Sequence, residues 1–133
     1  MRLILLVSAM NSGGAERVAA TLCNAWAQAG HEVDLVATYS GRGPCEYALD
    51  ARVRFVRLVD LLPSKTRPGS SWPMRVLQLR RIVADRKPTA IISFLTNVNI
   101  AAILATRGLR APLIVCERID PLAEQDLPLP WRW

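Results

Sequence analysis

Short, continuous apolar runs separated by segments with helical periodicity restrict the fold of this sequence more than any other feature. Strands that are buried on both faces, as in parallel sheets, read as unbroken apolar runs rather than as alternating patterns. Four such runs predict buried strands at 3–7, 33–38, 90–95 and 113–116. A fifth run, "VRFVRLV" at 53–59, alternates apolar and basic residues, which predicts a half-exposed strand at the edge of the sheet.

Three segments between these runs carry apolar residues at helical spacing and predict helices at 18–29, 74–86 and 97–107. Gly30 and Gly108 follow the first and third segments, where a left-handed residue commonly ends a helix, and Pro88 ends the second. The stretch 60–73 is rich in proline and serine and predicts a loop. With right-handed crossovers, this order of elements predicts an α/β fold with a Rossmann-like, doubly wound parallel sheet.

Two adjacent glycines, Gly13 and Gly14, lie between the first strand and the first helix. Ligands of such sheets bind beyond the carboxyl ends of the strands, and bare backbone there would let a phosphate or sugar approach the free N–H groups of the helix. The alternative is a tight turn with Ser12 capping the helix. A P-loop motif is absent, and a dinucleotide fingerprint is excluded because the second strand ends in Thr38-Tyr39 without an acidic residue.

The net charge of +6 is concentrated in one part of the chain, since residues 52–87 hold ten of the 17 lysines and arginines. A localised positive field attracts phosphates on nucleic acid, on anionic lipid or on a diphosphate substrate. Arg75, Arg80 and Arg81 are therefore candidates for contact with a membrane or an anion, although a solvated basic face is the alternative reading. No recognition-helix motif accompanies the charge, so we do not expect nucleic acid as a partner.

Three widely spaced cysteines and a single histidine predict neither a metal site nor a disulfide framework. The apolar run at the start of the chain is shorter than the core of a signal peptide, which has about 7–15 residues. No stretch reaches the roughly 20 apolar residues of a membrane span. We therefore expect a cytoplasmic protein that uses no metal and no cofactor.

Three stretches of the chain closely resemble retaining glycosyltransferases of family 4, which have the GT-B architecture. They read "GGAERVAATLCNAWAQAGHEVDLVAT", "KPTAIISFLTNVNIAAILA" and "APLIVCERIDP", and the likeness covers residues 1–121. The resemblance implies two Rossmann-like domains that face each other across a cleft. The N-terminal domain holds the acceptor, and the C-terminal domain binds the nucleotide sugar and carries the glutamate pair typical of the family.

The resemblance also implies roles for residues at matching positions. Ser12, Gly13 and Gly14 would form a loop that faces the donor. The wall of the cleft on the acceptor side would include Asn97, Asn99, Glu117, Arg118 and Asp120. Many family members place a histidine after the fifth strand, where this chain has Glu117 and Arg118, so we assign no catalytic residue.

The resemblance ends before a donor domain begins. We expect an incomplete N-terminal domain at 1–121 followed by a tail rich in proline and tryptophan at 122–133. The parent enzyme would transfer a sugar from a nucleotide diphosphate sugar to a glycan or lipid-linked glycan in the synthesis of cell-surface polysaccharide, at the inner face of the cell membrane. The chain alone would be inactive. The alternative function is a non-catalytic α/β module that docks on a membrane or a partner through its basic residues.

Overall fold

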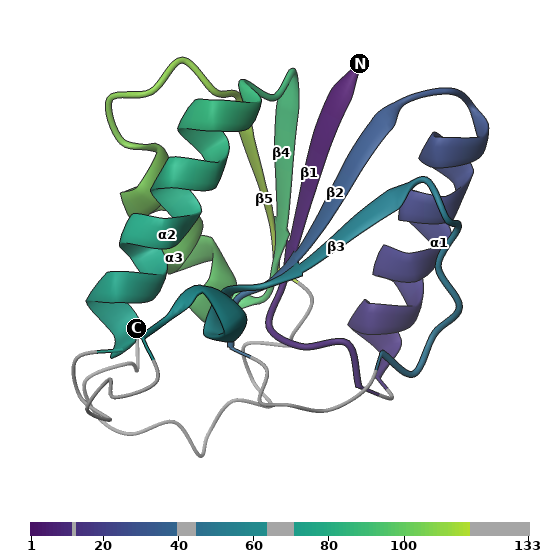
Figure 1. Ribbon diagram of the computed structural model, residues 1–133, viewed down its shortest axis with the longest axis horizontal. Helices are drawn as coiled ribbons and strands as arrows, with labels where there is room; N and C mark the ends of the chain where they lie inside the picture. The colour runs from purple at the N-terminus through teal and green to yellow at the C-terminus, as the bar shows by residue number, and fades with distance from the viewer. Residues whose placement is uncertain (12, 40–44, 64–70, 118–133) are drawn as a thin grey trace.

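The computed structural model describes residues 1–11, 13–39, 45–63 and 71–117. In chain order the elements are β1 (Arg2–Val7), α1 (Gly14–Gln28), β2 (Glu32–Ala37), β3 (Val53–Arg57), the 3-10 helix η1 (Leu58–Leu61), α2 (Ser71–Arg86), β4 (Ala90–Phe94), α3 (Thr96–Thr106) and β5 (Leu113–Cys116). The strands form one parallel sheet in the order β3-β2-β1-β4-β5. Helix α1 covers one face, and α2 and α3 cover the other (Figure 1). The predicted Rossmann-like, doubly wound sheet is therefore confirmed.

The central strand β1 contributes to two cores, one on each face of the sheet. Leu5 and Val7 pack in the cluster that includes Cys23 of α1. Ile4 and Leu6 point to the opposite face and pack in the cluster that includes Leu79 of α2 and residues of α3. Because successive side chains of a strand alternate between faces, an unbroken apolar run is what a strand covered on both sides requires.

The helices begin and end close to the predicted positions, with one informative difference. Helix α2 starts at Ser71, so Trp72 and Pro73 belong to its first turn and not to the predicted loop. Proline is tolerated there because the first N–H groups of a helix have no partner within the helix. Gly30 and Gly108 both have positive φ, as predicted for residues that end helices.

A fully apolar core surrounds Cys23, whose side chain has no exposed surface. Burial raises the pKa of this thiol to about 12, because a thiolate would lose its hydration there. We predict that iodoacetamide at pH 8 labels Cys23 only after the protein unfolds, as measured by mass spectrometry. The pKa of this thiol is near 9 in the unfolded chain and is raised in the folded state. Below pH 9 the thiol is protonated in both states, so its contribution to the free energy of unfolding is fully present. This contribution is lost as the pH rises from 9 toward 12, because the unfolded chain gives up the proton first. Labelling of native Cys23 as fast as that of the half-buried Cys45 would contradict this account.

Strand β5 differs from the expectation for its sequence. The apolar run at 113–116 predicted a strand covered on both faces, but β5 lies at the edge of the sheet, with Ile114 and Val115 about half exposed. Ile103 and Leu104 of the neighbouring helix α3 are exposed as well. The apolar composition correctly predicts a strand at this position. The burial of that strand depends instead on the elements that pack against it. At the opposite edge, β3 carries the exposed Arg54, which agrees with its predicted edge position.

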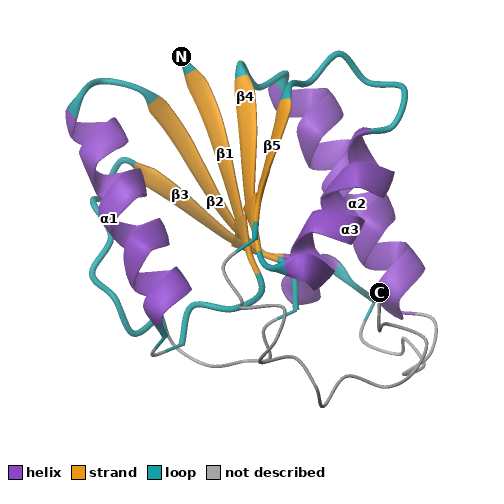
Figure 2. Ribbon diagram, turned by 180° about the vertical axis from the view of Figure 1, so that it is seen from behind, coloured by secondary structure: helices purple, strands orange, loops and turns teal. Residues whose placement is uncertain are grey.

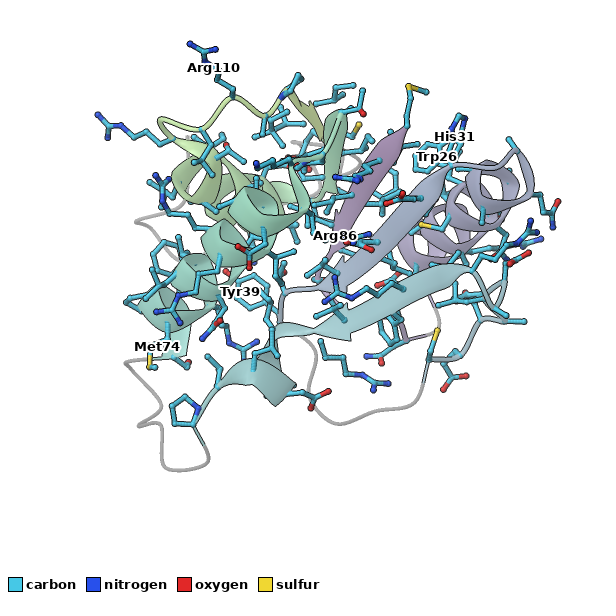
Figure 3. All side chains as sticks on the ribbon, turned by 45° about the horizontal axis from the view of Figure 1, so that its top comes forward. Trp26, His31, Tyr39, Met74, Arg86 and Arg110 are labelled. Carbon is cyan, nitrogen blue, oxygen red and sulfur yellow. The ribbon has the colours of Figure 1, made fainter. Side chains whose placement is uncertain are left out.

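An ion-pair network ties the C-terminal end of α2 to the sheet. Asp34 of β2 is 1% exposed. Arg86 of α2 donates to both of its carboxylate oxygens, with Nε–Oδ2 at 2.7 Å and Nη2–Oδ1 at 3.2 Å. Arg54 of the neighbouring strand lies 3.6 Å from the same carboxylate. Buried carboxylates require such partners, so Asp34 fixes α2 against β2. Figure 3 labels Arg86 at this place.

Candidate functional site

The first candidate site is the start of α1, where Gly13 is the N-cap residue and Gly14 is the first helical residue. Gly13 has extended backbone angles, and neither glycine has the positive φ that favours glycine. A Cβ atom at Gly14 would meet open space, whereas one at Gly13 would meet the flexible carboxylate of Glu16. The turn therefore does not require glycine at position 14.

Neighbouring residues fix this backbone without covering it. The hydroxyl of Tyr47 donates to the carbonyl oxygen of Gly13 at 3.0 Å. The N–H of Arg17 also donates to that oxygen, which is the first hydrogen bond of α1. The N–H groups before Arg17 lie outside the helical ladder, at the positive end of the helix dipole. Gly14 is exposed and Gly13 is half-exposed, with the carboxylate of Glu16 lying over Gly13, so contact of this backbone with a ligand stays a prediction.

A second candidate site is a cavity of about 430 Å³ at the same edge of the sheet. Its described lining consists of Tyr39, Trp72, Asn97 and Ile100. Tyr39 follows β2, Trp72 lies in the first turn of α2, and the other two lie near the start of α3. All these positions follow the carboxyl ends of strands or begin the helices on that side, as Figure 2 shows for the elements. Ligands of doubly wound sheets bind at this edge.

The junction between β4 and α3 holds the cavity wall in place. Leu95 has φ of 78°, which is strained for a residue with a side chain. The N–H of Leu95 donates to the carbonyl of Cys116, and its own carbonyl accepts from the N–H of Asn99. This backbone turn directs the start of α3, including Asn97, toward the cavity.

The structure separates the predicted wall residues into different environments. Asn97 is exposed on the cavity. Asn99 is 8% exposed, accepts from the hydroxyl of Ser93 at 2.6 Å and donates to the carbonyl of Cys116 at 3.3 Å. These contacts join β4, α3 and β5, so Asn99 has a structural role, and its contact with a ligand stays a prediction. Glu117 is exposed and accepts a hydrogen bond from Thr96 at 2.9 Å. Ser12, Arg118 and Asp120 lie outside the described residues.

The basic residues predicted to contact a membrane or an anion differ in what they contact. Arg75 donates to the carbonyl of Thr38 at 2.6 Å and is half-buried. Arg80 donates to the carbonyls of Ala105 and Arg107 at the end of α3. Of the three, Arg81 is exposed on α2. Arg80 therefore supports the C-terminal end of α3, and Arg75 joins α2 to the residue that follows β2.

Two further observations bear on cofactors and on membranes. Among residues 1–11, 13–39, 45–63 and 71–117, the structure contains no group of three or more histidine, cysteine, aspartate or glutamate side chains that could hold a metal ion. No helix in this described part of the chain is both long enough and apolar enough to cross a membrane.

Sequence reasoning found only part of the cavity. Tyr39 directly follows a predicted strand, at the edge of the sheet where ligands are expected, although it is not among the predicted site residues. Trp72 was assigned to a loop, because its place in the first turn of α2 depends on the contacts that hold α2 against β2. Ile100 was predicted correctly to lie in a helix, but an apolar residue at helical spacing gives no sign that it faces a cavity.

Comparison with known proteins identifies the family of the chain. Residues 13–133 match the family model of the glycosyl transferase 4-like domain. The chain is 35% identical over 121 residues to GalNAc-α-(1→4)-GalNAc-α-(1→3)-diNAcBac-PP-undecaprenol α-1,4-N-acetyl-D-galactosaminyltransferase of Campylobacter jejuni. That match covers 88% of this chain and 32% of the relative.

Two solved structures share the fold at low sequence identity. Sucrose-phosphate synthase from Thermosynechococcus elongatus superposes with a TM-score of 0.71 at 15% identity, over 95% of this chain and 35% of the synthase. Phytolacca americana apo UGT2 superposes with a TM-score of 0.63 at 12% identity, over 91% of this chain and 30% of that protein. The chain therefore spans about a third of the length of these proteins. Because the family model matches nearly the whole sequence, the chain belongs to the glycosyl transferase 4-like domain family.

Proposed function

We propose that this domain is the acceptor-side half of a retaining glycosyltransferase. The enzyme transfers a sugar from a nucleotide diphosphate sugar to a glycan or lipid-linked glycan for a cell-surface polysaccharide. A second Rossmann-like domain binds the nucleotide, and the exposed backbone at Gly13 and Gly14 approaches the diphosphate from this side of the cleft. Backbone N–H groups at a helix start can stabilise the charge that develops on a leaving diphosphate.

The open space above Gly14 is the observation that carries this proposal. A glycine in a helix lowers stability relative to alanine, and neither φ nor a neighbouring atom demands glycine at this position. The absent side chain is explained when a ligand must come within hydrogen-bond distance of the main chain. A metal ion is not part of the proposal, because the charge is stabilised by N–H groups and by the donor domain.

The name of the Campylobacter relative supports a lipid-linked glycan as acceptor, because the glycan in that name is joined through PP to undecaprenol. The proposed acceptor is of the same class, an oligosaccharide on a polyprenyl diphosphate. This assignment places the domain at the inner face of the cell membrane while it works.

The test of the proposed function compares two polypeptides in a transfer assay. The full-length polypeptide that contains this domain, incubated with labelled nucleotide sugars and a lipid-linked glycan, is expected to label the acceptor. The 133-residue chain alone is expected to give no transfer, since the groups that hold the nucleotide are supplied by the other domain. Transfer by the short chain alone would refute the two-domain arrangement. If the full-length polypeptide transfers no sugar from any of the nucleotide sugars, the proposed transferase function is refuted.

The alternative function, a non-catalytic module that docks on membranes, depends on basic residues that are free to contact lipid. Neutralising Arg80 and Arg81 together is expected to abolish binding to anionic vesicles, but Arg80 also supports the end of α3. Arg81→Gln is therefore the cleaner variant, with Arg110→Gln as a control that removes one exposed charge elsewhere. We predict weaker co-sedimentation with phosphatidylglycerol vesicles for Arg81→Gln alone, by about 1 kcal/mol. Equal binding of both variants and the wild type would count against membrane contact by α2.

A further inference from the structure

The cavity at the carboxyl edge of the sheet has the size and composition of a small-molecule site. Its volume of about 430 Å³ lies within the range of such sites, about 300–1,000 Å³. Tyr39 and Trp72 are each 36% exposed, so both present aromatic surface to solvent. Asn97 adds an exposed amide that can both donate and accept hydrogen bonds, and Ile100 adds apolar surface.

The aromatic pair is held in a fixed arrangement. The indole N–H of Trp72 donates to the hydroxyl oxygen of Tyr39 at 2.7 Å. Helix α2, which carries Trp72, is joined to β2 at both ends, by Arg75 to the carbonyl of Thr38 and by Arg86 to Asp34. Side chains fixed by such contacts lose less entropy when a ligand binds.

The chemistry of the described lining selects among ligand classes. The four lining residues that the structure describes are uncharged, so none of them offers a cation to a phosphate or another compact anion. A prenyl chain would bury the amide of Asn97 and the hydroxyl of Tyr39 without giving either a new hydrogen bond, which is costly. A pyranose ring has an apolar face of C–H groups that can lie against an aromatic ring, and it has hydroxyls around its rim for the amide.

We propose that this cavity binds one pyranose ring of the acceptor glycan, with the ring against Trp72 and Tyr39 and its hydroxyls on Asn97. The inference rests on the proposed function, because it names the part of the acceptor that this half of the cleft recognises. Trp72 is then a residue that determines acceptor affinity, and Arg75 is a positioning residue that holds α2 in place.

The direct test is a titration of the ¹⁵N-labelled chain, followed through the indole N–H resonances of its four tryptophans. The probes are methyl glycosides of common hexoses and N-acetylhexosamines, the disaccharide GalNAc-α-(1→4)-GalNAc, UDP and geraniol. We expect at least one sugar to shift the Trp72 resonance saturably. The resonance of Trp26 should not move, because Trp26 belongs to α1, which covers the opposite face of the sheet from α2 (Figure 3). No saturable shift with any sugar, or a shift with UDP or geraniol alone, would overturn the inference.

A kinetic test separates this inference from the proposed function. In the proposed full-length transferase, Trp72→Ala is expected to raise the KM for the acceptor about tenfold, which is near the lower end of the loss found when a nucleobase loses one aromatic stacking partner, and to leave the KM for the nucleotide sugar unchanged. Trp72→Phe, which keeps an aromatic ring, should recover most of the affinity, and Trp26→Phe is the control. Thermal unfolding shows whether each variant is folded. If Trp72→Ala leaves the KM for the acceptor unchanged while transfer continues, the inference of a sugar subsite is wrong, but the proposed transferase function is unaffected.

Discussion

Replacing Gly14 by valine is expected to lower kcat/KM for the nucleotide sugar by about a hundredfold or more in the proposed two-domain transferase, while the domain stays folded. The size follows from the loss of N–H donors to a developing negative charge, which lowers rates by about 10²–10³. The valine side chain would occupy the open space above the first turn of α1 and keep the diphosphate away from the main chain. The measurement is steady-state transfer at varied nucleotide sugar.

Stability measurements distinguish this effect from misfolding. Gly14 has helical backbone, and a Cβ atom there would meet no atom of the described residues within 4 Å. Gly14→Ala should therefore leave the free energy of unfolding unchanged or raise it by about 0.4–1 kcal/mol. Ala25→Val, an exposed position on the same helix, is the matched control and should keep its activity. A Gly14→Val enzyme with normal kinetics would show that the bare backbone has no role in donor binding.

The largest expected effect on stability comes from breaking the ion pair between the half-buried Arg86 and the buried Asp34. Arg86→Met removes both hydrogen bonds to a carboxylate that is almost fully buried. Arg54, at 3.6 Å and largely exposed, compensates only in part. Loss of one partner of a buried pair costs about 3–5 kcal/mol, so we expect the free energy of unfolding to fall by about 3 kcal/mol in urea titrations.

A double variant and a surface control make this test specific. Arg86→Met combined with Asp34→Leu removes the unpaired charge as well, and it should recover much of the lost stability. Arg52→Met breaks the pair with Asp50, in which Arg52 is well exposed, and should change the free energy of unfolding far less, because solvent screens such a pair. Equal losses for Arg86→Met and Arg52→Met would contradict the assignment of Asp34 as the buried anchor of α2.

The fold could be predicted from the sequence because its signals are local. Each unbroken apolar run marks a strand, and Gly30 and Gly108 mark helix ends through their positive φ. The burial of β5 could not be predicted in this way. Its composition is that of a covered strand, but its exposure depends on the elements that pack against the edge of the sheet.

The candidate site was predictable only where it follows strand ends. The glycine pair lies directly behind β1, so its position at the carboxyl edge follows from topology alone. Trp72 reaches the cavity through tertiary contacts, namely the hydrogen bond from Arg75 to Thr38 and the ion pair at the other end of α2. Similarly, the sequence does not distinguish the exposed Asn97 from the buried Asn99, because their environments are set by a strained turn at Leu95.

The most direct test of the central claim is a crystal structure of the full-length protein with a bound nucleotide diphosphate sugar. The account predicts a diphosphate oxygen about 3 Å from a main-chain N–H in the first turn of α1, above the open face of Gly14. The acceptor side of the sugar should face the cavity of Tyr39 and Trp72. A diphosphate bound elsewhere, with Gly14 covered by protein atoms of the second domain, would contradict it.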